Sequence, residues 1–189
     1  MNTPAHLIFG LSAFGDANFP RRNLAAVIGA LAPDLSLFIM VAWCILVQNI
    51  PPQVVFDTYY YSDSWQFVFA IDNSFILWGA LFGLACWRRW PVMIAFAGAG
   101  LLHLAFDFPL HNKDARQHFW PISDWVFHSP LSYWNSQHFG RIIGLAELLV
   151  CAGLIILLLG RFRRLPARTA IAGLALLEIM SSGLFYWLF

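Results

Sequence analysis

His103 and Asp107 are the residues of this sequence whose spacing most directly suggests chemistry. They lie four positions apart in the apolar stretch HLAFD, so on a helix the imidazole and the carboxylate meet on one face. The carboxylate can then bind a metal ion beside the histidine or fix the tautomer of the imidazole. His6 and Asp34 also interrupt apolar stretches, where ionisable groups are costly unless they are paired or hydrated. These four residues are candidate ligands of one metal ion; alternatively, His103 and Asp107 only satisfy each other inside a packed bundle.

The segment after Pro109 concentrates further histidines. Five of the six histidines lie between residues 103 and 138, together with several aspartates. Imidazole is the commonest metal ligand and a natural proton carrier, so this density favours a zinc or manganese site with a bound water as the nucleophile. His111 and His118 are the candidate proton donors. The alternative, favoured for His128 and His138, is an interfacial loop whose aromatic residues anchor it at the lipid headgroups while the histidines face water.

Other polar residues in the apolar stretches have more than one interpretation. Asp72 or Asn73 offers a further oxygen donor, and Asn73 is a candidate metal ligand. Glu147 and Glu178 could each be a general acid or base, a metal ligand or half of a proton-sharing pair. No G-x-S-x-G, Walker A, G-x-G-x-x-G or H-E-x-x-H motif is present, so serine hydrolase, nucleotide-binding and thermolysin-type functions have no support.

The composition indicates an integral membrane protein. Of 189 residues, 60% are hydrophobic and 11% are charged, whereas roughly a quarter of the residues of a soluble protein are charged. The net charge of +1 and the scattered basic residues argue against a nucleic-acid partner. Cys44, Cys86 and Cys151 lie in separate apolar stretches without C-x-x-C spacing, and we expect buried, inert thiols.

The apolar stretches predict a single all-α domain over residues 1–189, a polytopic transmembrane helical bundle of five to six spans. Each stretch reaches or approaches the ~20 residues needed to cross a bilayer. The first is the weakest and could instead be re-entrant, and Pro33 should bend the second where it lines a cavity. The candidate spans are residues 4–19, 24–47, 66–87, 91–110, 142–160 and 169–189, with outer loops at 49–65 and 111–141.

The basic residues predict the orientation of this bundle. Eight of the eleven lie in alternate turns, at 21–22, 88–89 and 161–168, and the positive-inside rule places those turns in the cytoplasm. Both long loops then face the periplasm of a bacterial inner-membrane protein. At ~1.5 Å per residue, the ionisable residues of the spans lie about 15 to 27 Å above the nearest cytoplasmic arginine. This common level predicts a shared site that opens outward.

The order of these residues resembles a known family. Thr3-Pro4-x-His6, Ala32-Pro33-Asp34, His103-x-x-x-Asp107 and His118-Phe119-Trp120-Pro121 together resemble the bacterial YbcI/YdjM-type inner-membrane proteins, which are described as membrane-bound metal-dependent hydrolases. Their ligand order is distantly similar to that of zinc-dependent phospholipase C. The resemblance covers most of residues 1–125. Two positions depart from the pattern: Ser36 replaces a second aspartate, and Asn73-Ser74 replaces a His-Ser step.

The residues and the resemblance together predict a metal-dependent hydrolase of an ester or phosphoester, with a membrane lipid as the expected partner. His6, Asp34, His103, Asp107 and Asn73 are the expected ligands of a divalent metal, zinc or manganese. Asp107 or Asp34 would accept the proton of the water, and His111 or His118 would protonate the leaving oxygen. The alternatives are a catalytically silent membrane subunit, with the aromatic outer loop as a protein-docking surface, and a small transporter or proton-conducting protein.

Overall fold

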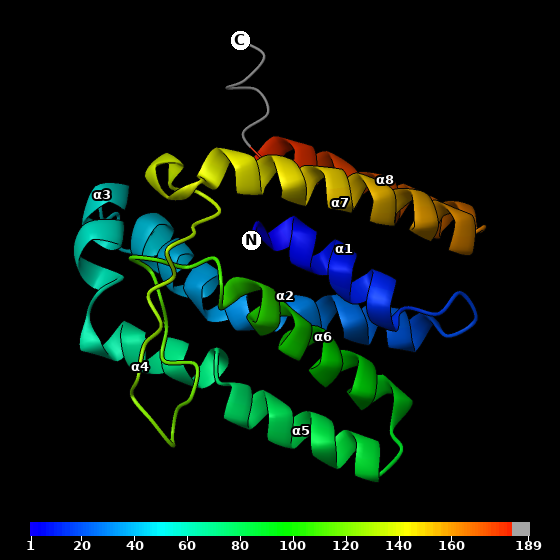
Figure 1. Ribbon diagram of the computed structural model, residues 1–189, viewed down its shortest axis with the longest axis horizontal. Coiled ribbons are helices and arrows are strands. Elements are labelled where there is room, and N and C mark those ends of the chain that lie inside the picture. The colour runs from blue at the N-terminus through cyan, green and yellow to red at the C-terminus, as the bar shows by residue number, and fades with distance from the viewer. Residues whose placement is uncertain (183–189) are drawn as a thin grey trace.

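The computed structural model describes residues 1–182, and within this range the chain forms helices and connecting segments but no strand. The predicted all-α class is therefore confirmed. The α-helices of Figure 1 are α1 (Thr3–Phe14), α2 (Pro20–Ala42), α3 (Pro52–Val54), α4 (Asp63–Asp72), α5 (Phe75–Trp87), α6 (Pro91–Asp107), α7 (Gly140–Arg161) and α8 (Leu165–Ser181). Short helical turns of other pitch occupy Trp43–Val47, Val55–Tyr59 and Ser136–His138.

Three helical stretches of the described chain are long and apolar enough to cross a membrane. They are Pro20–Val47, Asp63–Trp87 and Gly140–Arg161. Thr3–Phe14 and Pro91–Asp107 are apolar but shorter. The five to six spans expected from the sequence therefore stay a prediction, and the last candidate span, 169–189, lies partly outside the described residues.

The three arginine-bearing turns lie at one end of the bundle. The α1–α2, α5–α6 and α7–α8 connections all stand at the right of Figure 1, whereas the N-terminus and the segment that joins α6 to α7 lie toward the other end. That segment, expected as outer loop 111–141, is irregular up to the short turn before α7. The other expected outer loop, 49–65, contains α3, a helical turn and the start of α4, and its place outside the membrane stays a prediction.

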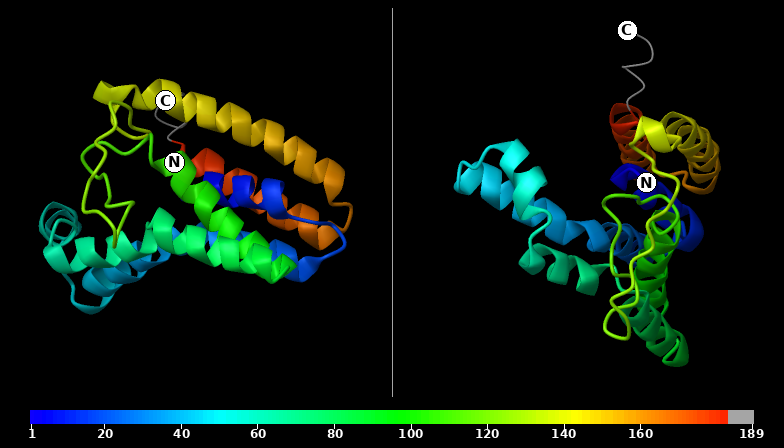
Figure 2. Two further views of the ribbon diagram at one scale, coloured as in Figure 1. Left: turned by 60° about the horizontal axis from the view of Figure 1, so that its bottom comes forward. Right: turned by 60° about the vertical axis from the view of Figure 1, so that its left-hand side comes forward.

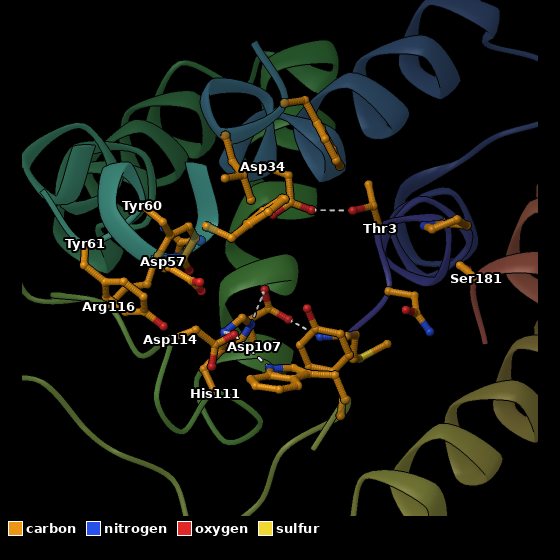
Figure 3. A pocket seen from close by; sticks show the side chains of 18 residues that line it. Thr3, Asp34, Asp57, Tyr60, Tyr61, Asp107, His111, Asp114, Arg116 and Ser181 are labelled. Carbon is orange, nitrogen blue, oxygen red and sulfur yellow. Dashed lines mark hydrogen bonds and ion pairs between the residues drawn. The ribbon is translucent and has the colours of Figure 1, made fainter. Parts of the chain in front are cut away.

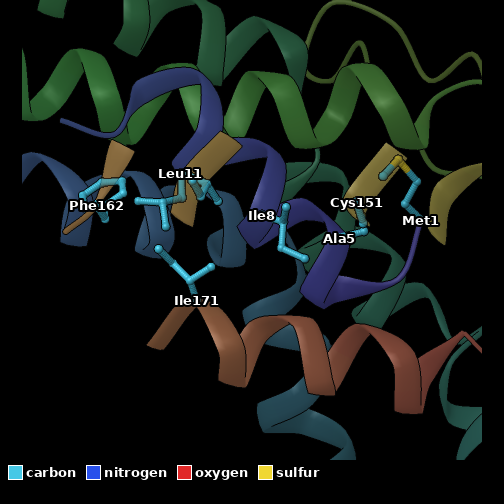
Figure 4. Close-up of a cluster of buried hydrophobic side chains, with 8 residues drawn as sticks. Met1, Ala5, Ile8, Leu11, Cys151, Phe162 and Ile171 are labelled. Atoms are coloured by element: carbon cyan, nitrogen blue, oxygen red, sulfur yellow. The ribbon is translucent and has the colours of Figure 1, made fainter. Parts of the chain in front are cut away.

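Helix α1 runs through the middle of the structure. It packs against α2 and α6 on one side and α7 and α8 on the other, as Figures 1 and 2 show. Its side chains Ile8 and Leu11 join a buried cluster with Cys151 of α7 and Ile171 of α8 (Figure 4). The weakest of the expected spans is thus enclosed by other helices, and this position fixes where His6 lies.

Small residues bring α2 and α6 close enough for their side chains to form one site. Gly29 of α2 lies against the backbone of α6, since a Cβ built there would be 2.0 Å from the carbonyl oxygen of Phe96. Gly98 and Gly100 of α6 are packed equally closely, against Phe14 and Trp78. Only residues of this size allow such an approach between helix backbones.

Two details of the apolar helices differ from the sequence-based expectation. Gly79 and Gly83 have the small-residue spacing that is typical of close helix packing, yet neither glycine has any described neighbour within 4 Å of a built Cβ. Cys86 was expected to be buried and is exposed, whereas Cys44 and Cys151 are buried. All three positions lie on α5, which packs mainly on α6 and belongs to a stretch long and apolar enough to cross a membrane.

Candidate metal centre

Three buried side chains from two helices converge at the loop-bearing end of α6. His6 Nε2 lies 2.9 Å from Asp107 Oδ1, and His103 Nε2 lies 3.1 Å from Asp107 Oδ2. The two imidazole rings stack with centroids 3.6 Å apart and an angle of 11° between their planes. One ligand atom from each of the three residues lies within 4.8 Å of the others, so the group could hold a metal ion. Within the described residues, this is the one group of three or more His, Cys, Asp or Glu side chains with such an arrangement.

The backbone of α2 fixes the orientation of His103. Its Nδ1 lies 2.6 Å from the carbonyl oxygen of Ala30, which can only accept, so Nδ1 carries the proton and Nε2 presents a lone pair toward Asp107. A backbone carbonyl behind the ligating imidazole is the usual outer partner in metal sites. Pro33, three residues farther along α2, has no N–H to donate to the Gly29 carbonyl, and the bend expected there stays a prediction.

The nitrogens that face Asp107 lie at ion-pair distance from its carboxylate but are not aligned with it for a hydrogen bond. His6 Nε2 and His103 Nε2 are fully buried at 2.9 and 3.1 Å from the carboxylate oxygens, and His111 Nε2 is placed in the same way at 3.2 Å. Buried polar atoms without an aligned partner are rare and require an explanation. Ligand atoms bound to one ion at ~2.05 Å stand about 3.3 Å apart in a tetrahedron, close to the distances here, and their lone pairs point at the ion rather than at each other. The donor set therefore fits a metal ion.

Asp34 extends the group from the α2 side. Its Oδ1 lies 3.7 Å from His103 Nε2, and its Oδ2 accepts a 2.7 Å hydrogen bond from the Thr3 hydroxyl. Asp34 is thus adjacent to the three closest residues and held by the first turn of α1. It can serve as a fourth ligand or as an acceptor for the proton of a water.

The Thr3–Asp34 hydrogen bond gives a prediction about metal affinity. Thr3→Val keeps the shape of the side chain but frees the carboxylate, and loss of such an outer partner typically weakens metal binding by about tenfold or more. We expect that loss in a competition titration with a chelator. Thr169→Val is the matched control, because the Thr169 hydroxyl bonds only to the carbonyl of Pro166 in an exposed turn. Equal affinities in both variants would contradict the role of Thr3.

His111 connects the group to the outer loop. Its Nε2 lies 3.2 Å from Asp107 Oδ2, and its Nδ1 lies 2.8 Å from Asp114 Oδ2. Burial disfavours the charged imidazole, but the two carboxylates outweigh it and raise the pKa of His111 to about 9. Burial likewise opposes ionisation of Asp114, and the hydrogen bond with His111 reverses this and lowers the pKa of Asp114. His111 therefore lies beside Asp107 and can carry a proton.

Two other expected site residues lie elsewhere. His118 Nδ1 is 2.9 Å from the carbonyl oxygen of Asn73, and its ring packs against Phe75 and Phe108. Burial lowers the pKa of His118 to about 4. The Asn73 side chain donates to the Phe69 carbonyl. The contacts that the structure gives His118 and Asn73 thus join the outer loop to the α4–α5 junction, and neither residue lines the cavity described below.

Glu147 and Glu178 are buried where α7 and α8 meet the start of α1. Glu147 Oε1 accepts a 2.9 Å hydrogen bond from the backbone N–H of Asn2. The first N–H groups of a helix have no partner within the helix, so a carboxylate there is favourable. Among the described residues, neither glutamate belongs to the group around Asp107. Glu147 therefore helps to position α1, and with it His6.

A cavity of about 640 Å³ opens beside this centre (Figure 3). Asp34, Asp107 and His111 line one part of it, and apolar side chains of α2 and the following segment line another. The α-amino group of Met1, which lies 2.5 Å from Asp107 Oδ1, borders the same space. The cavity also includes residues that sequence analysis did not assign to a site: Thr3, Tyr60, Asp114, Arg116 and Tyr133. In the sequence, Thr3 stood out only as part of the Thr3-Pro4-x-His6 motif, and Asp114, Arg116 and Tyr133 only by their position in the histidine-rich loop.

Comparison of the chain with protein-family models, with curated proteins and with solved structures finds no match.

Proposed function

We propose that this chain is a membrane-bound, metal-dependent hydrolase that acts on an ester or phosphoester. One observation carries the proposal: two buried imidazoles and one carboxylate converge within reach of a single ion at the wall of a cavity. The two imidazole nitrogens face the carboxylate oxygens without the alignment of a hydrogen bond, as ligands of one ion would. Two imidazoles and one carboxylate also match the protein ligands of catalytic zinc sites, which keep one position open.

The residues of the centre suit the proton transfers of hydrolysis. A divalent metal, when bound, activates a water molecule and polarises the scissile group. Asp34, which Thr3 holds beside His103, accepts the proton that the water loses as its oxygen attacks. His111 lines the cavity next to Asp107 and donates a proton to the leaving oxygen as the ester bond breaks. Asp107 holds His6 and His103 in their relative positions.

The resemblance to the YbcI/YdjM-type proteins supports the same assignment. His6, Asp34, His103 and Asp107 are the positions carried over from that pattern, and in the structure they are neighbours. The proposal places the protein in the bacterial inner membrane with the cavity toward the periplasm, since the arginine-bearing turns occupy the opposite end. Zinc suits the imidazole ligands, and manganese suits a site in which more carboxylate oxygens take part.

The test compares turnover with and without metal. Detergent-purified protein is stripped with a chelator, reloaded with zinc or manganese, and assayed with short-chain carboxylic esters, phosphomonoesters and phosphodiesters. We expect turnover of at least one class that disappears with the chelator and returns with the metal. A chain that binds no metal in either state and hydrolyses none of the three would instead be a catalytically silent membrane subunit.

His111→Gln gives a prediction specific to the proton donor. The amide keeps hydrogen-bonding capacity but cannot deliver a proton, and general acid catalysis contributes about 10²- to 10⁴-fold. We expect kcat to fall by about 10²-fold while metal content stays unchanged. His138→Gln is the control, because His138 bonds to the Pro130 carbonyl in the exposed part of the loop. An unchanged kcat in His111→Gln would remove this residue from the proposed chemistry.

A further inference from the structure

Arg116 is a buried cation in the wall of the cavity. Only 7% of the residue is exposed. Its guanidinium lies 4.0 Å from the ring centroid of Phe69 and 5.5 Å from that of Tyr60. Figure 3 shows the side chain beside Tyr60, with Asp114 next to it on the same wall. The two rings fix the plane of the guanidinium, so its donors have defined directions.

This guanidinium has no anionic partner among the described residues. Among the described residues no ion pair within 4.0 Å reaches it and Nη1 is fully buried without a hydrogen-bond partner, while Asp72 interacts with it only electrostatically from beyond that distance. Asp114, the carboxylate beside it on the wall, is already engaged by His111 Nδ1 at 2.8 Å and by Trp134 Nε1 at 3.1 Å. A buried charge without a counterion is costly, and aromatic faces compensate only part of that cost. The arrangement is therefore suited to an anion that comes from outside the chain.

The rest of the cavity indicates what kind of molecule carries that anion. Leu37, Phe38 and Phe56 line it, and the last two are about half exposed, at 46% and 47%. Phe38 belongs to a helix that is long and apolar enough to cross a membrane. The cavity thus offers apolar surface that belongs in part to a helix long and apolar enough to cross a membrane. Such a site fits a molecule with an anionic group at one end and hydrocarbon at the other.

We propose that Arg116 binds a phosphate group in this cavity, so that the substrate is a phosphoester rather than a carboxylic ester. The planar fork of a guanidinium matches two phosphate oxygens, whereas a neutral carboxylic ester would leave the buried charge unpaired. As a statement about the substrate, this inference rests on the proposed hydrolase function. As a statement about binding, it holds whether or not the protein hydrolyses anything.

The test measures binding to the full-length protein in detergent, as purified and after chelation. The probes are inorganic phosphate, a short-chain phosphatidic acid, the corresponding fatty acid and the corresponding neutral diacylglycerol. The key variant is Arg116→Met, which keeps apolar packing on Phe69 and Tyr60 but removes the charge. Arg88→Met is the matched control, because the Arg88 guanidinium also lies over aromatic rings, those of Trp87 and Trp90, but at the opposite end of the bundle.

We expect phosphatidic acid to bind the wild type with or without metal, and Arg116→Met to weaken binding by about tenfold to a hundredfold, as for a charge-assisted hydrogen bond. Arg88→Met should bind as the wild type does. Inorganic phosphate that competes with phosphatidic acid would identify the phosphate itself as the recognised group, and binding of the lipid alone would show that its chains are also required; both support the inference. Equal binding in wild type and Arg116→Met, or equal binding of fatty acid or diacylglycerol, would overturn it.

The same variants separate this inference from the proposed function. Phosphate binding that depends on Arg116, without metal-dependent turnover of any ester, would end the hydrolase proposal and leave the anion site standing. Metal-dependent turnover of carboxylic esters with an unchanged KM in Arg116→Met would end the inference alone. If both are correct, Arg116→Met raises KM for phosphoesters by at least about tenfold and keeps its metal.

Discussion

Replacement of His103 by alanine should remove the bound metal and reduce metal-dependent turnover to background. His103 supplies one of three closely placed ligand atoms, and its Nδ1 is fixed by Ala30. Loss of an outer partner alone costs about 10- to 100-fold in metal affinity, so loss of the imidazole should cost more than about 100-fold. The measurement is elemental mass spectrometry of detergent-purified wild type and variant, combined with the turnover assay.

His128→Ala is the control for the loss of a histidine as such. The His128 Nδ1 bonds to the Asn112 carbonyl at 2.9 Å in the exposed loop, outside the centre. This variant should keep both metal and turnover. Helical circular dichroism and a single gel-filtration peak would show that His103→Ala is folded. A folded His103→Ala that retains stoichiometric metal would contradict the assignment of this residue.

Gly29→Ala should destabilise the protein and weaken the centre, although Gly29 is not a ligand. A Cβ at this position would lie 2.0 Å from the Phe96 carbonyl oxygen and 2.7 Å from the Phe96 carbonyl carbon, so α2 and α6 must separate. Helix α2 carries Asp34 and the Ala30 carbonyl, whereas α6 carries His103, and separation lengthens the contacts between them. Overpacking of this kind typically costs about 1 to 3 kcal/mol, and backbone atoms cannot move aside as a side chain can.

Gly79→Ala is the matched control because it makes the same chemical change at a helix position with open space around it. No described atom lies within 4 Å of a Cβ at Gly79, and alanine favours a helix over glycine by about 1 kcal/mol. Thermal unfolding in detergent should therefore show a lower Tm for Gly29→Ala and an equal or higher Tm for Gly79→Ala. Metal affinity should fall only in Gly29→Ala. Equal Tm values for Gly29→Ala and wild type would show that α2 and α6 are not held as closely as described.

The core of the centre was predictable because it depends on local spacing and on burial. Residues four apart, such as His103 and Asp107, lie on one face of any helix. Ionisable residues in apolar stretches are costly unless they are paired or hydrated, so they tend to contact one another. His6, Asp34 and Asp107 accordingly meet His103 in the structure. The common level of these residues in successive helices followed from counting residues along each helix.

The outer loop was less predictable because its contacts depend on tertiary structure. Asp107 and His111 have the i, i+4 spacing of a helix, but Pro109 stands between them and α6 ends at Asp107, so the contact could not be inferred from the spacing alone. Nothing in the position of His118 indicates that it packs on Phe75. In the sequence, Arg116 served only as one of the basic residues counted for the membrane topology. Its burial could not be foreseen, because it depends on packing against Phe69 of α4. A loop without periodicity carries no information about which of its side chains turns inward.

The sequence does not show which of its glycines lie against a neighbouring helix. Gly98 and Gly79 both lie in apolar stretches, yet the first lies against Phe14 and the second has open space. The break between α4 and α5 likewise falls inside the expected span 66–87, at the polar residues Asn73 and Ser74. Helix α4 ends at Asp72, and Ser74 caps α5 by accepting a hydrogen bond from the Leu77 N–H at 3.1 Å. Such outcomes depend on which faces meet, and composition does not specify them.

The central claim is that His6, His103 and Asp107 hold one metal ion, and X-ray absorption of the zinc-loaded protein tests it most directly. The account predicts a first shell of nitrogen and oxygen only, at about 2.0 to 2.1 Å, with the multiple-scattering signature of two imidazoles. That signature should fall to one imidazole in His6→Ala, provided that the variant still retains zinc. A sulfur neighbour at about 2.3 Å, an imidazole count that does not change in His6→Ala, or a wild type that retains no zinc would contradict it.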